Sequence, residues 1–412
     1  MTETGVPMPL NDLSLPDAEP ATAPWQAFLG LAGPDAWARR MAELALRTRP
    51  HSWRGRAAQQ RHALELILSR LSRPEAGRPG PGRAEHLLLA LARDAVALSD
   101  ALPAAPRARL REQLLQGLTG EATLIPLFHL LREAARQRAR GFEVRFTGLT
   151  EGTPYDLLLT RDGVEAELAC EMFSAEEGRP VPRGDWCALM DGINPDLQTW
   201  LAAHPGRYLL KMTLPEGIHG PEQLSELQRR ISALLAAQKR QDASAAAVLK
   251  LDPLMLAGAR MAAQRDLPSQ LRAQFGPDAH LAVTGDPAGG SVFVLAARAG
   301  QDNTVAQAAV RGLGQATARL SGSRPGILSV FLDDIDRLEW RGLREALELE
   351  GAVRRFFTSP AARPLAAASF TTRHEIFGTA PPDAAAEGEL RFRNSAHPAA
   401  ADPALRPAIA SC

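Results

Sequence analysis

Residues 141–172 read GFEVRFTGLTEGTPYDLLLTRDGVEAELACEM. Apolar and polar residues alternate over residues 142–146, a short apolar run occupies residues 156–160, and strict alternation returns over residues 164–172. Period-two alternation is typical of strands with one buried face, and the Arg-Asp-Gly sequence between the last two segments supplies a hairpin turn. This stretch therefore predicts one strand followed by a two-stranded hairpin.

A helix is predicted directly before these strands, over residues 121–140. Leu124, Leu127 and Leu131 recur there at helical spacing. Arginines gather in the last turns, where positive charge suits the carboxyl end of a helix, and a glycine follows. The sequence therefore predicts the order helix, strand, hairpin.

The same criteria divide the rest of the chain. Residues 1–24 are polar and Pro-rich and are expected to be a disordered leader, whereas residues 25–120 predict a helical region. Further helices are expected at residues 185–203, 221–241, 303–320 and 338–357, and further strands at residues 207–213, 246–251, 281–284, 292–297, 327–332 and 365–370. Such alternation of strands and helices is typical of an α/β protein.

The α/β part is expected to contain a core at residues 121–241 and a C-terminal α/β region at residues 242–380. The second region either extends the sheet of the first or forms a sheet of its own, and the pattern leaves both arrangements open. The tail at residues 381–412 is rich in Ala and Pro and is expected to be loosely ordered, with residues 390–393 as an edge strand.

Composition and charge limit the class of protein. A chain of 412 residues that is 45% hydrophobic can bury two or three globular cores, and its net charge of zero argues against a nonspecific polycation. The apolar runs are too short for a membrane span and the first residues do not resemble a secretion signal, which predicts a cytoplasmic protein without a membrane partner. Cys170, Cys187 and Cys412 form no CxxC pair, so neither a disulfide framework nor a structural zinc site is expected.

The order helix, glycine, strand, Pro-x-Asp, turn, acidic strand resembles the core of the PD-(D/E)XK nuclease superfamily, over roughly residues 120–215. In that family a helix leads into a three-stranded meander, an aspartate starts the second strand, and a (D/E)xK triplet lies on the third. Pro154 and Asp156 match the first motif. The resemblance implies a restriction-endonuclease-like mixed sheet in which carboxylates bind Mg²⁺, and the ion activates water for attack on DNA.

The triplet can be placed in two registers. Spacing from the hairpin turn puts Ala169, Cys170 and Glu171 at the family's (D/E)xK positions, so the acid is Ala and the lysine is Glu. A shift of four residues gives an ExE variant that ends at Glu167, and a compromise places the metal-binding acid at Glu167 alone. Residues two apart on a strand share a face, but Glu167 and Glu171 should lie about 13 Å apart, too far to bind one ion on a regular strand.

Two other elements could complete the site. Lys211 lies in the strand predicted at residues 207–213, which would neighbour the hairpin in the family's fold, and the resemblance allows a relocated lysine. Glu121 or Glu133 on the preceding helix could supply an additional carboxylate, as in some members of the family. The expected site therefore consists of Asp156 and Glu167 as Mg²⁺ ligands, with Glu171 and Lys211 beside them.

Arginines are concentrated in the helical part of the chain. Residues 37–140 contain 19 arginines and nine acids, a net charge of +10. Arg132, Arg136 and Arg140 are four residues apart, so they share one face of the predicted helix and could contact a phosphate backbone. The alternative is a solvated helical surface, and the sequence favours neither.

Other catalytic motifs are absent from the sequence. None of the three lysines follows a glycine, which excludes a P-loop and with it a nucleotide cofactor of that kind. Asp333, Asp334 and Asp336, after the strand at residues 327–332, are expected to be loop or cap residues. No zincin motif and no nucleophile elbow occur.

Three hypotheses of function follow. The first is a Mg²⁺-dependent phosphodiesterase that acts on DNA. The second is a catalytically degenerate nuclease fold that serves as a nucleic-acid-binding or protein-scaffolding module. The third is a protein-interaction subunit that binds no nucleic acid.

Overall fold

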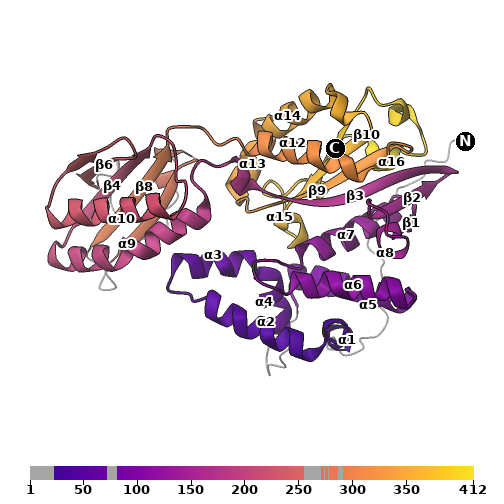
Figure 1. Ribbon diagram of the computed structural model, residues 1–412, viewed down its shortest axis with the longest axis horizontal. Coiled ribbons are helices and arrows are strands. Elements are labelled where there is room, and N and C mark those ends of the chain that lie inside the picture. Colours follow the sequence, from indigo (N-terminus) through magenta and orange to yellow (C-terminus); the bar gives the residue numbers. More distant parts are fainter. Residues whose placement is uncertain (1–22, 72–80, 255–270, 273, 277, 286–290) are drawn as a thin grey trace, which may run out of the picture.

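The computed structural model describes residues 23–71, 81–254, 271–272, 274–276, 278–285 and 291–412. A disordered leader was expected at residues 1–24, and residues 1–22 of it lie outside the described ranges. Figure 1 shows three lobes: a helical lobe, a lobe around a first sheet and a lobe around a second sheet. Both sheets mix parallel and antiparallel pairs, so the protein is mixed α/β as expected.

The helical lobe contains only helices among its described residues, as the pattern over residues 25–120 predicts. Its helices are α1 (Ala23–Ala32), α2 (Pro34–Arg47), α3 (Trp53–Arg61), α4 (Ala63–Leu71), α5 (Arg83–Ala101) and α6 (Ala104–Gly117). The buried rings of Trp25, Phe28 and Trp37 form its centre, and Phe28 also contacts Phe128 of α7 at a centroid distance of 5.7 Å. This aromatic contact joins the helical lobe to the first-sheet lobe.

The first sheet has the strand order β1-β2-β3-β9-β10-β11. Its strands are β1 (Glu143–Arg145), β2 (Leu157–Arg161), β3 (Val164–Ser174), β9 (Gly326–Asp333), β10 (Leu365–Thr371) and β11 (Leu390–Arg393). The antiparallel pairs β1–β2 and β2–β3 confirm the predicted strand and hairpin, whereas β3, β9 and β10 run parallel. Because a parallel pair needs a long crossover, β9 can lie far from β3 in the sequence.

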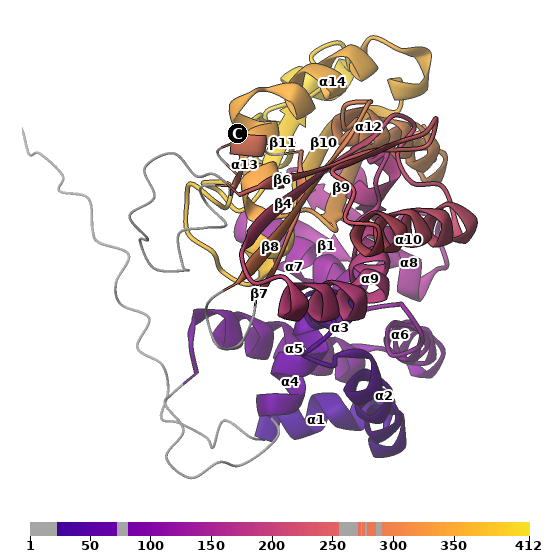
Figure 2. The same cartoon turned by 90° about the vertical axis from the view of Figure 1, so that its left-hand side faces the viewer.

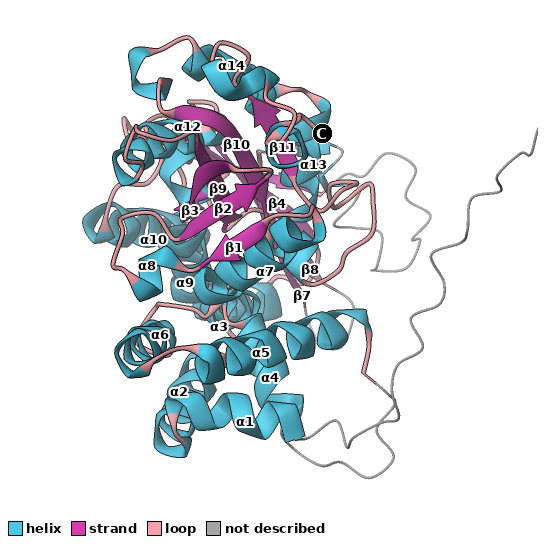
Figure 3. Cartoon of the chain, turned by 90° about the vertical axis from the view of Figure 1, so that its right-hand side faces the viewer, coloured by secondary structure: helices cyan, strands magenta, loops and turns pink. Residues whose placement is uncertain are grey.

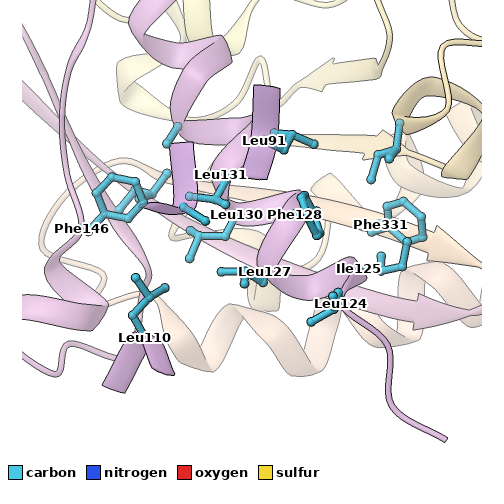
Figure 4. Close-up of a cluster of buried hydrophobic side chains, with 14 of the residues drawn as sticks. Leu91, Leu110, Leu124, Ile125, Leu127, Phe128, Leu130, Leu131, Phe146 and Phe331 are labelled. Carbon is cyan, nitrogen blue, oxygen red and sulfur yellow. The ribbon is translucent and has the colours of Figure 1, made fainter. Parts of the chain in front are cut away.

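Helices cover both faces of the first sheet. On one face lies α7 (Ile125–Ala139), whose Leu127, Phe128 and Leu131 join a buried cluster with Phe331 of β9 (Figure 4). On the other face lie α12 (Val305–Ala316) and α14 (Glu348–Phe357), as Figure 3 shows. Ala169 of β3 belongs to this second cluster, so Glu167 and Glu171 at its sides face α12 and not α7.

The remaining short elements connect these layers. They are α8 (Thr147–Thr150), η2 (Thr317–Arg319), α13 (Arg337–Glu345), η3 (Pro360–Ala362), α15 (Arg373–Ile376), η4 (Pro398–Ala401) and α16 (Arg406–Ile409). The helix expected at residues 338–357 is two helices, because Leu347 between them adopts a positive φ of 56°. The tail is built into the fold: Leu405 and Ile409 are buried, and β11 confirms the predicted edge strand.

The second-sheet lobe is inserted between β3 and α12. After β3 the chain passes η1 (Ala175–Gly178), and it returns at Thr304, whose backbone N–H donates to the carbonyl of Gly178 over 2.6 Å. The lobe contains α9 (Arg183–Ala203), β4 (Arg207–Leu214), α10 (Pro221–Ala236), β5 (Gln241–Ala243), β6 (Val248–Pro253), β7 (His280–Gly285) and β8 (Val292–Ala299). Its strand order is β5-β6-β4-β8-β7, and α9 and α10 pack on one face (Figure 2).

This insertion corrects two expectations. The strand at residues 207–213 was expected beside the hairpin, but β4 pairs with β6 and β8 in the second sheet, and β9 takes the place beside β3. A boundary after residue 241 would divide the second sheet, because β4 lies before it, β5 begins at Gln241 itself, and β6 to β8 follow. The C-terminal half therefore both completes the first sheet and contributes to the second.

Candidate functional site

The candidate site lies where β2 and β3 separate. The last pair of the hairpin on this side is Leu157 with Leu168, after which β3 continues along β9 alone. Asp156, one residue before β2, therefore lies opposite Ala169. Its Oδ2 accepts a hydrogen bond from the backbone N–H of Cys170 over 2.7 Å, so the aspartate is held against the ACE sequence of residues 169–171.

Arg319 occupies the space beside this aspartate. It ends η2, directly after α12, and its Nη2 donates to Oδ2 of Asp156 over 2.9 Å. Its Nη1 donates to Oε1 of Glu171 and to the carbonyl of Cys170, both over 2.8 Å. Its Nε donates to the carbonyl of Pro154 over 2.7 Å. One guanidinium thus joins the aspartate, the third residue of the ACE sequence and two carbonyls.

The electrostatics of the cluster follow from its partial burial. Burial raises the pKa of Asp156 above its ordinary value, although Arg319 and the N–H of Cys170 act in the opposite direction. Burial also opposes the charge of Arg319, but Asp156 and Glu171 together outweigh it and raise the pKa of the guanidinium. The cation is therefore firmly charged and serves as the counter-ion of both carboxylates.

Glu167 belongs to a separate cluster. Its fully buried carboxylate accepts hydrogen bonds from the backbone N–H of Ser321, over 2.7 Å, and from the Ser321 hydroxyl. Arg324 lies 3.6 Å from it and pairs with Glu165 over 2.7 Å. Glu167 pairs with Leu158 in the hairpin, two residues beyond the position opposite Asp156. The structure therefore gives the two expected metal ligands different partners.

The other expected members lie elsewhere. Lys211 of β4 is in the second sheet, where its Nζ lies 3.3 Å from Oδ2 of Asp252, so it is not beside the hairpin. Glu121 pairs with Arg47 of the helical lobe over 2.6 Å. Glu133 is buried and pairs with Arg136 on α7, against the opposite face of the sheet. None of the three contacts Asp156 in the part of the chain that the structure describes.

The arginine stripe of α7 points inward. Arg132 donates to Oγ1 of Thr371 over 2.7 Å and to the carbonyl of Gly388 in the tail over 3.1 Å, and Arg136 and Arg140 both pair with the buried carboxylate of Glu389. Burial alone would raise the pKa of Glu389, but these arginines lower it below its ordinary value. The three guanidiniums therefore tie α7 to the tail, and they do not form an exposed surface for a phosphate backbone.

The residues at Asp156 do not fit a Mg²⁺ ion. Mg²⁺ requires oxygen ligands around it, whereas here a guanidinium lies between the two carboxylates and Ala169 has no donor atom in its side chain. Among the described residues, no group of three or more His, Cys, Asp or Glu side chains could hold a metal ion. Arg319 itself was not foreseen, because it follows a helix about 150 residues after the hairpin and belongs to no motif.

Comparison with known proteins adds no relative: no protein-family model, no curated protein and no solved structure matches this chain. Within the described ranges, none of the helices is both long enough and apolar enough to cross a membrane.

Proposed function

We propose that this protein is a catalytically degenerate nuclease-like module that binds nucleic acid without a metal ion. The order of its elements supports the resemblance to the PD-(D/E)XK superfamily: α7, the meander β1-β2-β3, then the crossover helix α12 and the parallel strand β9. The second-sheet lobe is then an insertion between the third strand and the crossover helix.

The observation that carries the proposal is the position of Arg319. It contacts Asp156 and Glu171 at the point of the meander where the family's carboxylates bind their metal ion. A guanidinium supplies a fixed positive charge, but it accepts no hydrogen bond and does not activate water in the way that a metal ion does. The cluster can therefore hold the meander together but lacks the group that hydrolysis needs.

Binding without catalysis is supported by the charge distribution. Residues 37–140 carry a net charge of +10 in a protein that is neutral overall, and +7 remains when the inward-pointing Arg132, Arg136 and Arg140 are left out. An excess of arginine on one part of a protein favours contact with a phosphate backbone, and the affinity of such a contact falls steeply with salt. Nucleic acid is therefore the partner that we infer for the module, in preference to a protein partner alone.

The test is a pair of assays on the full chain, with labelled DNA in single-stranded and duplex form. Fluorescence anisotropy should show the same affinity in Mg²⁺ and in a chelator, and denaturing gels should show no cleavage. Asp156→Asn keeps the shape of the side chain and should change neither result. Mg²⁺-dependent cleavage that this variant abolishes would establish the enzyme instead, and no binding of either DNA would leave a protein-scaffolding module.

A further inference from the structure

Two adjoining cavities lie where the three lobes meet. Their volumes are about 420 Å³ and about 1100 Å³. Both are lined by Gln60 of α3, Arg183 and Cys187 of α9, and Asp336 before α13. Because they share these walls, we treat them as one groove, the α3–α9 groove. Its volume exceeds the roughly 300–1,000 Å³ that a small-molecule pocket usually offers.

The walls of the α3–α9 groove are held in place by Asp191. This residue of α9 accepts hydrogen bonds from the backbone N–H groups of Trp53, over 2.7 Å, and Arg54, over 3.0 Å. Its carboxylate thus caps the first turn of α3 from another lobe, and the Trp53 ring packs against the core of the second-sheet lobe. The helical lobe and the second-sheet lobe therefore present a fixed surface to the groove.

The floor of the groove is formed where parallel strands of the first sheet end. Asp334 follows β9 directly, Asp336 lies two residues further on, and Arg373 follows Thr372 after β10. In open α/β sheets ligands bind beyond the carboxyl ends of the parallel strands, because the loops there diverge and leave a crevice. The groove therefore occupies the usual ligand position of the first sheet, at a different place from the Asp156 cluster.

The groove carries more arginines than acids. Nine arginines and seven acids line it. Several acids already hold an arginine of the wall: Arg183 lies 2.9 Å from both Asp336 and Glu339. In contrast, Arg54 and Arg56 of α3 are exposed, and the described residues contain no ion-pair partner for either. These two guanidiniums are the ones available to an anionic ligand.

Aromatic rings lie beside these charges. The guanidinium of Arg56 lies over the Trp53 ring, 4.2 Å from its centroid. Across the groove the His280 ring lies 5.6 Å from the Trp186 ring. Burial and nearby arginines lower the pKa of His280 to about 4, so its ring is neutral and can stack like any other aromatic surface. The Trp53 and His280 rings are half-buried, so each keeps an edge that the groove can reach. Arginine beside accessible aromatic surface is the combination that binds unpaired bases and their phosphates.

We propose that the α3–α9 groove binds a single strand of nucleic acid, with phosphates on Arg54 and Arg56 and bases against Trp53 and His280. This inference rests on the proposed function, and it locates the binding of nucleic acid in the groove, away from the Asp156 cluster. A duplex is disfavoured, because its bases stack on one another and are not free to stack on side chains. DNA and RNA strands share this chemistry, so both are ligands to test.

The test compares two double variants of the full chain. Arg54→Ala with Arg56→Ala removes the free charges of the groove, and Arg39→Ala with Arg111→Ala removes two exposed arginines from the outer surface of the same lobe. Anisotropy is measured with oligothymidylate and oligouridylate of about 12 nucleotides, the matching DNA duplex, and thymidine monophosphate as a competitor. Trp53→Phe, which keeps a ring in the core contact, serves as a third variant.

The groove variant should bind single strands about tenfold more weakly. The slope of log affinity against log salt should fall in magnitude by about 1.4, because two phosphate contacts to the single strand are lost. The outer-surface variant should retain its affinity. Preference for one of the two strands identifies the ligand as DNA or RNA. Two results would contradict single-strand binding in the α3–α9 groove: equal losses of affinity in both double variants, or binding of the duplex or the monophosphate as tight as that of the strand. Either result would leave the proposed function unaffected. If the wild-type protein bound no nucleic acid, both would fail.

Discussion

Nη2 of Arg319 lies 2.9 Å from Oδ2 of Asp156, although 163 residues separate the two in the chain. The contact joins the segment that follows the crossover helix α12 to the start of β2. The whole second-sheet lobe lies between these two segments in the sequence. The contact follows from the fold, because β9 pairs with β3 and the segment before β9 must cross the face on which Glu171 lies. In this protein the positive charge beside the carboxylates of the meander is therefore supplied by an arginine of the chain itself.

Removing this cation should destabilise the fold. Arg319→Ala removes the guanidinium that donates to Asp156, to Glu171 and to two carbonyls, and we expect the free energy of unfolding to fall by about 2 kcal/mol. Arg319→Lys keeps the charge with fewer donors and should lose less. Urea denaturation at neutral pH measures both. The matched control is Arg354→Ala, which breaks an exposed pair with Glu350 on α14 and should cost less than about 0.5 kcal/mol. Equal costs for Arg319→Ala and this control would contradict the structural role of Arg319.

The junction of the insertion should be intolerant of a side chain. A Cβ at Gly178 would lie 2.5 Å from the Cα of Val305, where the chain returns from the second-sheet lobe. Because backbone atoms would have to move, Gly178→Ala should cost about 1–3 kcal/mol. Gly184→Ala, in the first turn of α9 with no atom within 4 Å of the added carbon, should leave the stability unchanged or slightly higher. Thermal unfolding of the two variants checks this, and a Gly184→Ala protein that unfolds earlier than Gly178→Ala would refute the close approach.

Stability should depend on pH through Glu65. Burial raises the pKa of this residue of α4 from 4.5 to about 7, while the backbone N–H of Leu124 donates to its Oε1 over 3.0 Å. The folded protein therefore keeps a proton that the unfolded chain releases above pH 4.5, and stability falls as pH rises from 4.5 to about 7. Glu65→Gln stays neutral at every pH. Its free energy of unfolding, relative to that of the wild type, should therefore rise through that window by about 3 kcal/mol.

Urea denaturation of both proteins across this pH range measures the difference. His62 lies nearby, and its pKa is lowered to about 4 by burial and by Arg40. Because its titration is common to both proteins, it cancels in the comparison. A difference in stability that stays constant with pH would show that folding does not raise the pKa of Glu65.

The sequence predicted local structure well, because local structure depends on neighbouring residues. Alternation and the turn residues identified the hairpin, helical spacing identified α7, and Asp336 proved to be a cap residue as expected, accepting the N–H of Glu339. The pairing of β3 with β9 could not be predicted, since strands so far apart are brought together by packing and not by a pattern. Lys211 was misplaced for this reason, because a strand of either sheet has the same period.

The candidate site was predicted in part. The first of the two registers, which counts from the hairpin turn, placed Ala169 and Glu171 beside Asp156, and they lie there in the structure. Spacing also placed Arg132, Arg136 and Arg140 on one face of α7, but it did not reveal that Glu389, in a tail expected to be loose, would cover that face. Met172 shares with Cys170 the face of β3 opposite the glutamates, yet it is 38% exposed, because β3 there extends beyond β2.

The role of Arg319 as a built-in counter-ion is tested most directly by a calorimetric titration of Mg²⁺ and of Mn²⁺ into the wild-type protein and into Asp156→Ala, with circular dichroism to establish that the variant is folded. Because Arg319 is the counter-ion of Asp156 and Glu171, we expect no binding of either ion to either protein. Binding to the wild type that disappears in Asp156→Ala would contradict this role and would establish a metal site at the meander.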